Sequence, residues 1–497
     1  MSRPHLDSGT SNRARPALSR KPAAIRRTKI VATLGPAWET PEQMHALLDA
    51  GVNVVRVNSS HGTPEIRARW ISDFHAVQRE RPASSALLVD LQGPRIRVGG
   101  LPAPRTLEPG EEIVFAPEDS AAESEIPTTY AELAGDVKAG DRILLDDGLL
   151  SVEVLSIKGD RVRGRVRYGG VLKANKGMNL PGIEVSAPAV TEKDREDAKA
   201  AAALGVDYIG MSFVRRPGDL EAMRRLLPRQ IKLIAKIEKD TALRHLEGIL
   251  EAADGLMVAR GDLGVELPFE QVPLVQKRLI REANRHGKPV ITATQMLESM
   301  IQAPRPTRAE ASDVANAILD GTDAVMLSAE TAVGRYALES VLAMDRIARE
   351  VEGHSHEDGR ETVEAEPAFR IRQPHATTRT EDAISVAVCA AAELLRVPLI
   401  VCLTASGFTA RTVASYRPTV PILAVTPEQE TFRQLAMVWG VIPALTPHYP
   451  DYEAILPFTR SSITRLGLAG PGDRIVVTAG VPFDVAGTTN LLKIETV

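Results

Sequence analysis

The sequence contains only two cysteines among its 497 residues, Cys389 and Cys402, and both lie in apolar runs. Neither has the spacing of a metal site, and two thiols cannot build a disulfide framework. Buried free thiols are typical of proteins kept in a reducing compartment. The sequence therefore predicts a cytoplasmic protein.

Long apolar runs and an excess of one charge are also missing. No apolar stretch is long enough to cross a bilayer, and the formal net charge is -4. Such a balance argues against a dedicated nucleic-acid surface but says nothing about small anions, whose binding depends on local clusters. We therefore expect neither a membrane nor a nucleic acid as partner.

The length of the chain indicates two to four domains. Residues 1–24 are basic, rich in Ser, Pro and Ala, and lack an apolar signal segment, so a disordered tail is expected there. A transit peptide is the alternative for this segment.

Eight short apolar segments, most of them joined by helical patterns, dominate the chain from 29 to 330. Their nearly continuous aliphatic character is that of strands covered on both faces. Eight βα units in order predict a (β/α)8 TIM barrel, which we assign to residues 25–92 and 184–351. The segments are KIVATLG (29–35), VNVVRVN (52–58), SALLVDL (85–91), DYIGMSF (207–213), KLIAKIE (232–238), DGLMVAR (254–260), KPVITATQ (288–295) and DAVMLSAE (323–330).

Two regions fall outside this pattern. Residues 93–183 alternate as short strands with turn signals such as Asp147-Gly148 and Gly159-Asp160, which predicts an all-β module inserted after the third barrel strand. Residues 352–380 are polar and aperiodic and are expected to be a linker. Helix and strand patterns alternate again over 381–497, as in a separate open α/β domain.

Polar residues end almost every predicted barrel strand, where such barrels build their active sites. Lys236 and Glu238 lie two residues apart and so point to one face, and Asp262 follows the neighbouring strand. The carboxylates of Glu238 and Asp262, with no His or Cys cluster nearby, suit Mg²⁺ or Mn²⁺. The alternative for Lys236 and Glu238 is a buried ion pair with a purely structural role. The other rim residues are Arg56, Asn58, Ser60, His61, Asp90, Arg95, Arg97, Ser212, Arg260, Thr294, Gln295, Ser328 and Glu330.

Two glycine-containing segments have the composition of anion sites. In VARGDLGVELP (258–268), Gly261 and Gly264 permit a tight turn that aims N–H groups into the rim, although an ordinary strand-to-helix turn explains the same pattern. In LTASGFTAR (403–411), hydroxyls precede a helix, as in a phosphate site or an ordinary N-cap. With Arg56, Arg97 and Lys236 near a metal, the rim has the equipment of phosphoryl transfer.

These motifs resemble the pyruvate kinase family over residues 25–497. The predicted order of barrel, inserted β module and C-terminal α/β domain is also that of the family. The matching segments are TLGPA (33–37), RVNSSHG (56–62), DLQGPRIR (90–97), KGMNLPG (176–182), MSFVR (211–215), AKIE (235–238), VARGDLGVE (258–266), ATQMLESM (293–300) and SAETAVGRYA (328–337).

The resemblance implies transfer of the phosphoryl group of phosphoenolpyruvate to ADP, giving pyruvate and ATP in glycolysis. It also implies that the β module is a lid, that a phosphorylated sugar or nucleotide acts as allosteric effector, and that the chain forms a homotetramer. The implied residues are Lys236, Arg56, Thr294 and Arg97 for catalysis; Ala259, Arg260, Gly261, Asp262, Ser212, Ser328 and Glu330 for the substrate; Arg97, Lys176, Asn58, His61 and Pro36 for the nucleotide; Glu238 and Asp262 for Mg²⁺; and Thr404, Ser406, Gly407 and Thr409 for the effector phosphate.

The stretch VDLQGPRIR (89–97) departs from the sequence that is commoner in the family. Many members with the commoner sequence bind K⁺ at this position. The family's K⁺ ligands map to Asn58, Ser60, Asp90 and the carbonyl of Leu91, but Arg95 stands where many members have Glu. A positive charge about 4 Å from a phosphoryl oxygen contributes on the order of 4 kcal/mol at an effective dielectric near 20. We therefore expect that Arg95 replaces K⁺ and that K⁺ is not required.

Two alternatives to this enzyme remain at the level of the sequence. Another phosphoenolpyruvate-handling barrel enzyme would not need the lid or the effector-like domain. A catalytically silent paralogue that senses phosphometabolites would have lost Lys236, Glu238, Asp262 or Thr294, and all four are present.

Overall fold

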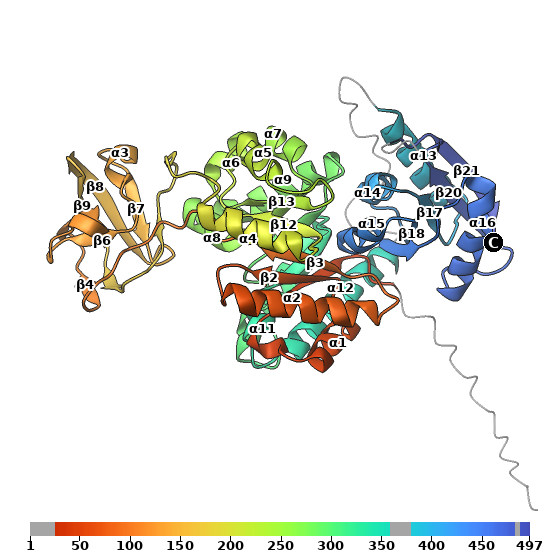
Figure 1. Cartoon of the computed structure of the whole chain (residues 1–497), viewed down its shortest axis with the longest axis horizontal. Helices are drawn as coiled ribbons and strands as arrows, with labels where there is room; N and C mark the ends of the chain where they lie inside the picture. Colours follow the sequence, from red (N-terminus) through yellow and green to blue (C-terminus); the bar gives the residue numbers. More distant parts are fainter. Residues whose placement is uncertain (1–24, 358–378, 483–487) are drawn as a thin grey trace, which may run out of the picture.

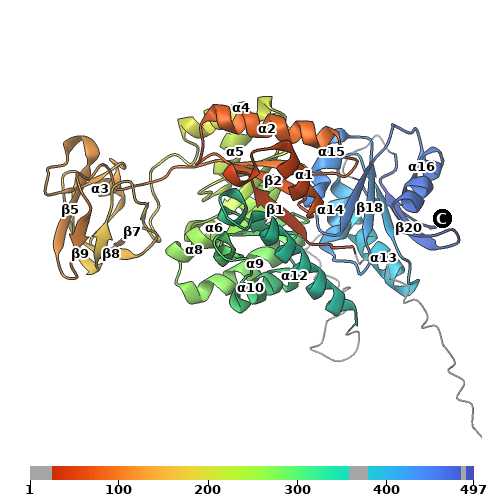
Figure 2. The same ribbon diagram turned by 90° about the horizontal axis from the view of Figure 1, so that it is seen from below.

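The computed structural model describes residues 25–357, 379–482 and 488–497. They form an all-β module, a central barrel and a C-terminal α/β domain, with the barrel in the middle (Figures 1 and 2). The predicted tail, residues 1–24, lies outside the described residues. No helix in the described ranges combines the length and apolar character needed to cross a membrane.

Eight parallel strands close the central barrel in the order β1-β16-β15-β14-β13-β12-β3-β2. Alternate residues of each strand face the inner core and the surrounding helices, which explains the continuous apolar runs in the sequence. The (β/α)8 prediction is confirmed. The strands are β1 (Lys29–Thr33), β2 (Val54–Asn58), β3 (Ala86–Asp90), β12 (Tyr208–Met211), β13 (Lys232–Ile237), β14 (Gly255–Ala259), β15 (Val290–Ala293) and β16 (Ala324–Leu327).

Helices cover the outside of the barrel. Thr40, Thr191 and Thr307 each begin one with a capping box, in which the hydroxyl and the third helical side chain exchange bonds with the backbone; such caps stabilise a helix by about 1 kcal/mol. The elements are η1 (Pro36–Trp38), α1 (Pro41–Asp49), α2 (Pro64–Arg79), α4 (Glu192–Ala203), α5 (Pro217–Arg224), α6 (Asp240–Arg244), α7 (Leu246–Ala252), α8 (Arg260–Glu266), η3 (Phe269–Gln271), α9 (Val272–Arg285), η4 (Glu298–Ile301), α10 (Arg308–Leu319), α11 (Ala329–Ala332) and α12 (Ala337–Glu357).

The all-β module projects from the barrel between β3 and α4 (Figure 1). Its main sheet has the order β11-β7-β8-β9-β5-β6, and β4 pairs with β10. The predicted turns at Asp147-Gly148 and Gly159-Asp160 join β7 to β8 and β8 to β9. The elements are β4 (Arg105–Leu107), β5 (Glu112–Pro117), η2 (Glu118–Ser120), β6 (Ile126–Thr128), α3 (Leu133–Asp136), β7 (Arg142–Leu145), β8 (Leu150–Lys158), β9 (Arg161–Tyr168), β10 (Gly170–Leu172) and β11 (Met178–Asn179).

The C-terminal domain is an open sheet in the order β19-β18-β17-β20-β21, parallel except for β21 at the edge. Both cysteines are buried in this domain. The elements are α13 (Thr380–Leu394), β17 (Ile400–Leu403), α14 (Phe408–Ser415), β18 (Ile422–Thr426), α15 (Gln429–Gln434), η5 (Leu435–Met437), β19 (Val441–Leu445), α16 (Tyr452–Arg465), β20 (Arg474–Ala479) and β21 (Leu491–Thr496).

The predicted linker, 352–380, was too long at both ends. Helix α12 continues to Glu357 and α13 begins at Thr380, while residues 358–378 lie outside the described residues. The last turns of α12 are polar (EGHSHE), so no apolar periodicity marked them as helical.

The C-terminal domain closes the end of the barrel opposite the β module. Ala436 and Met437 of η5 join the inner core of the barrel, and the Tyr208 hydroxyl donates to the Gln434 carbonyl at 2.6 Å. The open end of the barrel therefore faces the β module alone.

Candidate active site

A cavity of about 700 Å³ opens at the carboxyl ends of the barrel strands. Because all eight strands are parallel, the residues that end them meet at this rim. Most residues expected from the sequence line this cavity: Pro36, Arg56, Asn58, Ser60, His61, Asp90, Arg95, Ser212, Lys236, Glu238, Ala259, Asp262, Thr294 and Ser328.

Asp90, at the end of β3, is the buried anion around which the rim is organised. Arg56 donates to its carboxylate from Nε at 2.9 Å and Nη2 at 2.7 Å, and Lys236 Nζ lies 3.1 Å from its other oxygen. Burial raises the pKa of Asp90, but Lys236 and Arg56 outweigh it and the net pKa lies below its usual range. Asp90 is therefore ionised and holds two cations at the cavity floor.

Lys236 on β13 lies between two carboxylates. Its Nζ is 3.1 Å from Asp90 and 2.9 Å from Glu238, and it donates to the Ser212 hydroxyl at 2.6 Å. Burial lowers the pKa of Lys236, but the two carboxylates overcome that effect and raise it to about 12. The ammonium group is thus permanently charged and fixed in direction.

Glu238 is a buried carboxylate whose charge is only partly compensated. It accepts the Phe213 N–H at 2.7 Å and shares Lys236 with Asp90. Burial raises the pKa of Glu238, and the nearby Asp262 adds to this effect against the attraction of Lys236. A divalent cation bound by both carboxylates would relieve this cost, so the pair fits Mg²⁺ or Mn²⁺. The described residues contain no group of three or more His, Cys, Asp or Glu suited to a metal.

Thr294, just after β15, has a strained backbone. Its φ is +68°, a left-handed conformation that a β-branched residue rarely adopts. The Arg260 guanidinium donates to the Thr294 carbonyl at 2.7 Å, and the Gly261 N–H donates to the Thr294 hydroxyl at 2.8 Å. Contacts from α8 therefore stabilise this strained conformation. Thr294 lines the cavity, and its hydroxyl donates to the Ala293 carbonyl at 2.6 Å.

Three residues expected to bind substrate, Arg260, Gly261 and Glu330, do not line the cavity, and the side chains of Arg260 and Glu330 have other partners. The guanidinium of Arg260 is occupied by backbone carbonyls near Thr294 and by Asp313 at 2.7 Å. Glu330 accepts the N–H groups of Ser328 at 2.7 Å and Leu297 at 3.1 Å. Both side chains fix loops around the site. The Leu91 carbonyl, a position of the family's K⁺ site, accepts the Ser212 hydroxyl at 2.8 Å.

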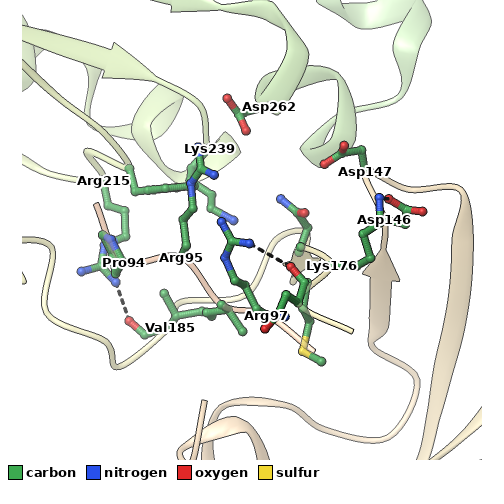
Figure 3. Close-up of a pocket in the computed structure, with 16 residues that line it drawn as sticks. Pro94, Arg95, Arg97, Asp146, Asp147, Lys176, Val185, Arg215, Lys239 and Asp262 are labelled. Atoms are coloured by element: carbon green, nitrogen blue, oxygen red, sulfur yellow. Dashed lines mark hydrogen bonds and ion pairs between the residues drawn. The ribbon is translucent and has the colours of Figure 1, made fainter. Parts of the chain in front are cut away.

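A second cavity, of about 360 Å³, lies between the β module and the barrel (Figure 3). Arg97 donates to the Asn175 carbonyl at 2.8 Å, and Lys176 pairs with Asp146 at 2.8 Å. Arg95 lines both cavities. Burial, and then the charges of Arg95, Arg56 and Arg97, lower the pKa of His61. This histidine is therefore neutral near pH 7 and suited to contact rather than to hold an anion.

Five charged or aromatic residues of this second cavity were not identified from the sequence as site residues. Their signal in the sequence was weak, because most of them do not end a barrel strand. The segment MSFVR (211–215) contains two of them, and AKIE (235–238) ends just before a third. They are Asp146, Asp147, Phe213, Arg215 and Lys239.

The loop before α14 borders a third cavity, of about 340 Å³. Thr404, Ser406 and Thr409 line it, and Gly407 is the N-cap of α14 with φ of +74°. Thr446 also lines it, and its hydroxyl is buried and has no hydrogen-bond partner among the residues that the structure describes.

Comparisons with known proteins agree with this architecture. Residues 25–341 match the model of the pyruvate kinase barrel domain, and residues 382–495 match that of the pyruvate kinase alpha/beta domain. The chain is 45% identical to the pyruvate kinase of Geobacillus stearothermophilus over 482 residues, which cover 95% of this chain and 80% of the relative. It is 45% identical to that of Staphylococcus aureus (strain MRSA252) over 480 residues, 95% of this chain and 81% of the relative.

A solved structure gives the same result. The crystal structure of a pyruvate kinase from Cryptosporidium parvum superposes with a TM-score of 0.86 at 33% identity, covering 95% of this chain and 96% of that chain. Family models, curated relatives and fold thus converge, and the chain belongs to the pyruvate kinase family of phosphotransferases.

Proposed function

We propose that this chain transfers the phosphoryl group of phosphoenolpyruvate to ADP, giving pyruvate and ATP, through the residues of the 700 Å³ cavity. The observation that carries the proposal is the buried set of Arg56, Asp90, Lys236 and Glu238, which fixes two cations where a phosphoryl group would lie. Phosphoryl transfer requires mainly positioning and charge neutralisation.

Lys236 and Arg56 would bind the phosphoryl oxygens, because both are held by Asp90 and need no reorganisation to act. Glu238 and Asp262 would hold Mg²⁺ or Mn²⁺. The bound ion would supply additional charge neutralisation between phosphate and enolate oxygen. The raised pKa of Glu238 supports this assignment, since a cation removes the cost of its charge.

The carboxylate of the substrate would lie against Ala259 and Asp262, which line the cavity, and the intervening Gly261 at the start of α8, with Ser212 and Ser328 at its sides. The Gly261 N–H already donates to Thr294, so the carboxylate would share this donor or use that of Asp262. The Thr294 hydroxyl, fixed next to this position, would take part in protonation of the enolate at C3.

Arg97 and Lys176 would bind the nucleotide phosphates, with Asn58, His61 and Pro36 near the nucleoside. The cationic cavity between lid and barrel supports this placement. Lys176 pairs with Asp146 within the lid, so phosphate must compete with that carboxylate when it binds. Closing the lid would exclude water as a competing acceptor.

Arg95 would replace K⁺ in this enzyme. It lines the substrate cavity, and both oxygens of Asp90, a position of the family's K⁺ site, lie against Arg56 and Lys236. A further cation from solution, such as K⁺, would be repelled by these positive charges. We therefore expect turnover without K⁺.

The third cavity would bind the phosphate of an allosteric effector through Thr404, Ser406 and Thr409 before α14. The buried, unpartnered Thr446 hydroxyl supports a polar ligand there. The described lining contains Glu428 and His448 but no Lys or Arg. A sugar or nucleotide with one phosphate is therefore favoured over a bisphosphate, because His448 lies 3.7 Å from Glu428 and no other side chain of the described lining can carry a positive charge.

We also propose that the chain acts in the cytoplasm and as a homotetramer. The two buried free thiols support a reducing compartment, and the open edge of β21 offers a strand that could pair between subunits.

The test of the main proposal is formation of ATP from phosphoenolpyruvate and ADP by the purified chain. The assay uses Mg²⁺ or Mn²⁺, with and without K⁺ and sugar monophosphates. Absence of turnover under all these conditions would refute catalysis and favour the silent, metabolite-sensing paralogue.

A further inference from the structure

The short loop that follows β12, residues 212–215, contacts the two site residues at the end of β13, Lys236 within the strand and Glu238 just after it. The Ser212 hydroxyl accepts from Lys236 at 2.6 Å, and the Phe213 N–H donates to Glu238 at 2.7 Å. Phe213 has a φ of +54°, an uncommon conformation for a bulky residue. The loop therefore fixes the directions of the ammonium and carboxylate groups at the cavity floor.

The same loop touches the outgoing connection from barrel to lid. Ser212 donates to the Leu91 carbonyl at 2.8 Å. Gly93 packs so closely that an added Cβ would lie 2.6 Å from the Phe213 ring and 2.9 Å from Ser212 Cβ. Gly93 also has a φ of +69°, so both space and backbone favour glycine there.

Arg215 holds the returning connection. Its Nη1 donates to the Val185 carbonyl at 2.5 Å and its Nη2 to the Ala187 carbonyl at 2.8 Å; the first bond is visible in Figure 3. The side chain is only 14% exposed. A guanidinium presents paired donors in one plane, so it sets both the position and the orientation of this segment.

The lid holds the opposite edge of the same segment. The Ala187 N–H donates to the Tyr130 hydroxyl at 3.1 Å, and the Ser186 N–H donates to Asp136 at 2.7 Å. Tyr130 in turn donates to Asp136. Residues 185–187 are thus joined by their carbonyls to the barrel and by their N–H groups to the lid.

We propose that Arg215 is a positioning residue that sets the lid relative to Lys236 and Glu238, acting through residues 185–187. This inference rests on the proposed function, since the lid matters only if phosphoryl transfer takes place beneath it. Arg95, Arg97 and Lys176 all reach the reaction from the lid side, so a small displacement of the connection moves these cations from the phosphates. The same displacement admits water.

Water entry has its own chemical signature. When ADP is the acceptor, the P–O bond to the enolate breaks, a P–O bond to the ADP oxygen forms, and the enolate takes a proton at C3. When water is the acceptor, the new bond forms to water oxygen, which loses a proton, and the products are pyruvate and inorganic phosphate. The ratio of pyruvate to ATP therefore reports how well the lid excludes water.

The test compares Arg215→Ala with Arg216→Ala. Arg216 is the next residue, its side chain is 71% exposed, and its ion pair is with Asp219 alone, so it is a matched control. Pyruvate, ATP and inorganic phosphate are measured separately. Arg215→Ala is expected to lower kcat for ATP formation about tenfold to a hundredfold, to raise the pyruvate to ATP ratio above one, and to change KM for phosphoenolpyruvate less than KM for ADP. Arg216→Ala should keep a ratio of one.

Tyr130→Phe keeps the inference testable if Arg215→Ala does not fold. This change removes the lid-side bond to Ala187 and leaves the barrel intact, so a smaller rise in the ratio is expected. The ratio of pyruvate to ATP for Arg215→Lys should lie between the ratios for wild type and Arg215→Ala. A ratio of one in every folded variant, with or without loss of kcat, would overturn the inference. Wild-type protein that forms no ATP would instead refute the proposed function.

Discussion

Replacing Asp90 by Asn tests the electrostatic design of the site most directly. The change keeps the shape of the side chain but removes the charge that Arg56 contacts at 2.7 Å and Lys236 at 3.1 Å. Removing one partner of a buried ion pair costs about 3–5 kcal/mol, because the other charge remains buried. At about 2–4 °C per kcal/mol for a domain of this size, the melting temperature of the barrel should fall on the order of 10 °C.

The stability difference between wild type and Asp90→Asn should depend on pH. The pKa of Asp90 is lowered in the folded protein by Lys236 and Arg56 against the effect of burial. Its contribution is therefore complete above the unfolded pKa, about 3.9, and is lost as the pH falls through the lower folded pKa. The difference between the two melting temperatures should have its full size at pH 7 and should shrink as the pH falls through the acid range.

Asp90→Asn should also alter the charge of Lys236. Burial lowers the pKa of Lys236, and Asp90 and Glu238 together raise it to about 12. With Asp90 neutral, burial is opposed mainly by Glu238 and the pKa falls. The alkaline limit of kcat should therefore move to lower pH.

The assay is thermal unfolding followed by circular dichroism from pH 3 to 8, together with a pH profile of kcat. Glu221→Gln is the control, because the Glu221–Arg225 ion pair is 61% and 76% exposed and such pairs contribute less than about 1 kcal/mol. A melting temperature for Asp90→Asn within about 2 °C of wild type at pH 7 would refute the reasoning, since the two cations would then need no buried counterion.

Three further changes test the assigned roles. Lys236→Met should lower kcat for ATP formation by about a thousandfold while calorimetry still detects ADP binding; a loss of less than tenfold would contradict its role. Arg95→Glu should create a K⁺ requirement, read as turnover in tetramethylammonium buffer with and without KCl; strong activation of the wild type by K⁺ would contradict the substitution of Arg95 for the ion. Thr446→Val should weaken activation by a hexose or nucleoside monophosphate about fivefold, the loss of one hydrogen bond, and an unchanged activation constant would remove Thr446 from the effector site.

The sequence predicted which residues reach the rim but not how they pair. The ends of the strands can be predicted from the sequence, because the strands of a parallel barrel are continuous apolar runs that stop at polar residues. Asp90 stands beside Arg95 and Arg97 in the sequence, yet its partners are Arg56 and Lys236, 34 and 146 residues away. Neighbours on a barrel are set by strand order and register, and a local pattern contains no information about them.

The sequence also did not predict in which direction a side chain points once the strand has ended. Arg260 and Glu330 follow β14 and β16 as expected, but the short helices α8 and α11 turn both side chains toward backbone groups. Arg215 is the opposite case: it belongs to the segment MSFVR (211–215), but that segment does not indicate that its guanidinium binds the carbonyls of the returning lid connection. Its role exists in the tertiary structure alone.

The charges around the two cavities bear on how the proposed lid would close. On the barrel floor, Arg56 and Lys236 are paired with Asp90 and Glu238, and Asp262 adds a further carboxylate to the same cavity. The lid cations have partners within the lid, since Arg97 donates to the Asn175 carbonyl and Lys176 pairs with Asp146. If phosphoryl transfer takes place as proposed, the phosphates of the substrates would compete with these partners and draw the lid cations over the cavity. The contacts of residues 212–215 would then hold the connection in register while the lid closes.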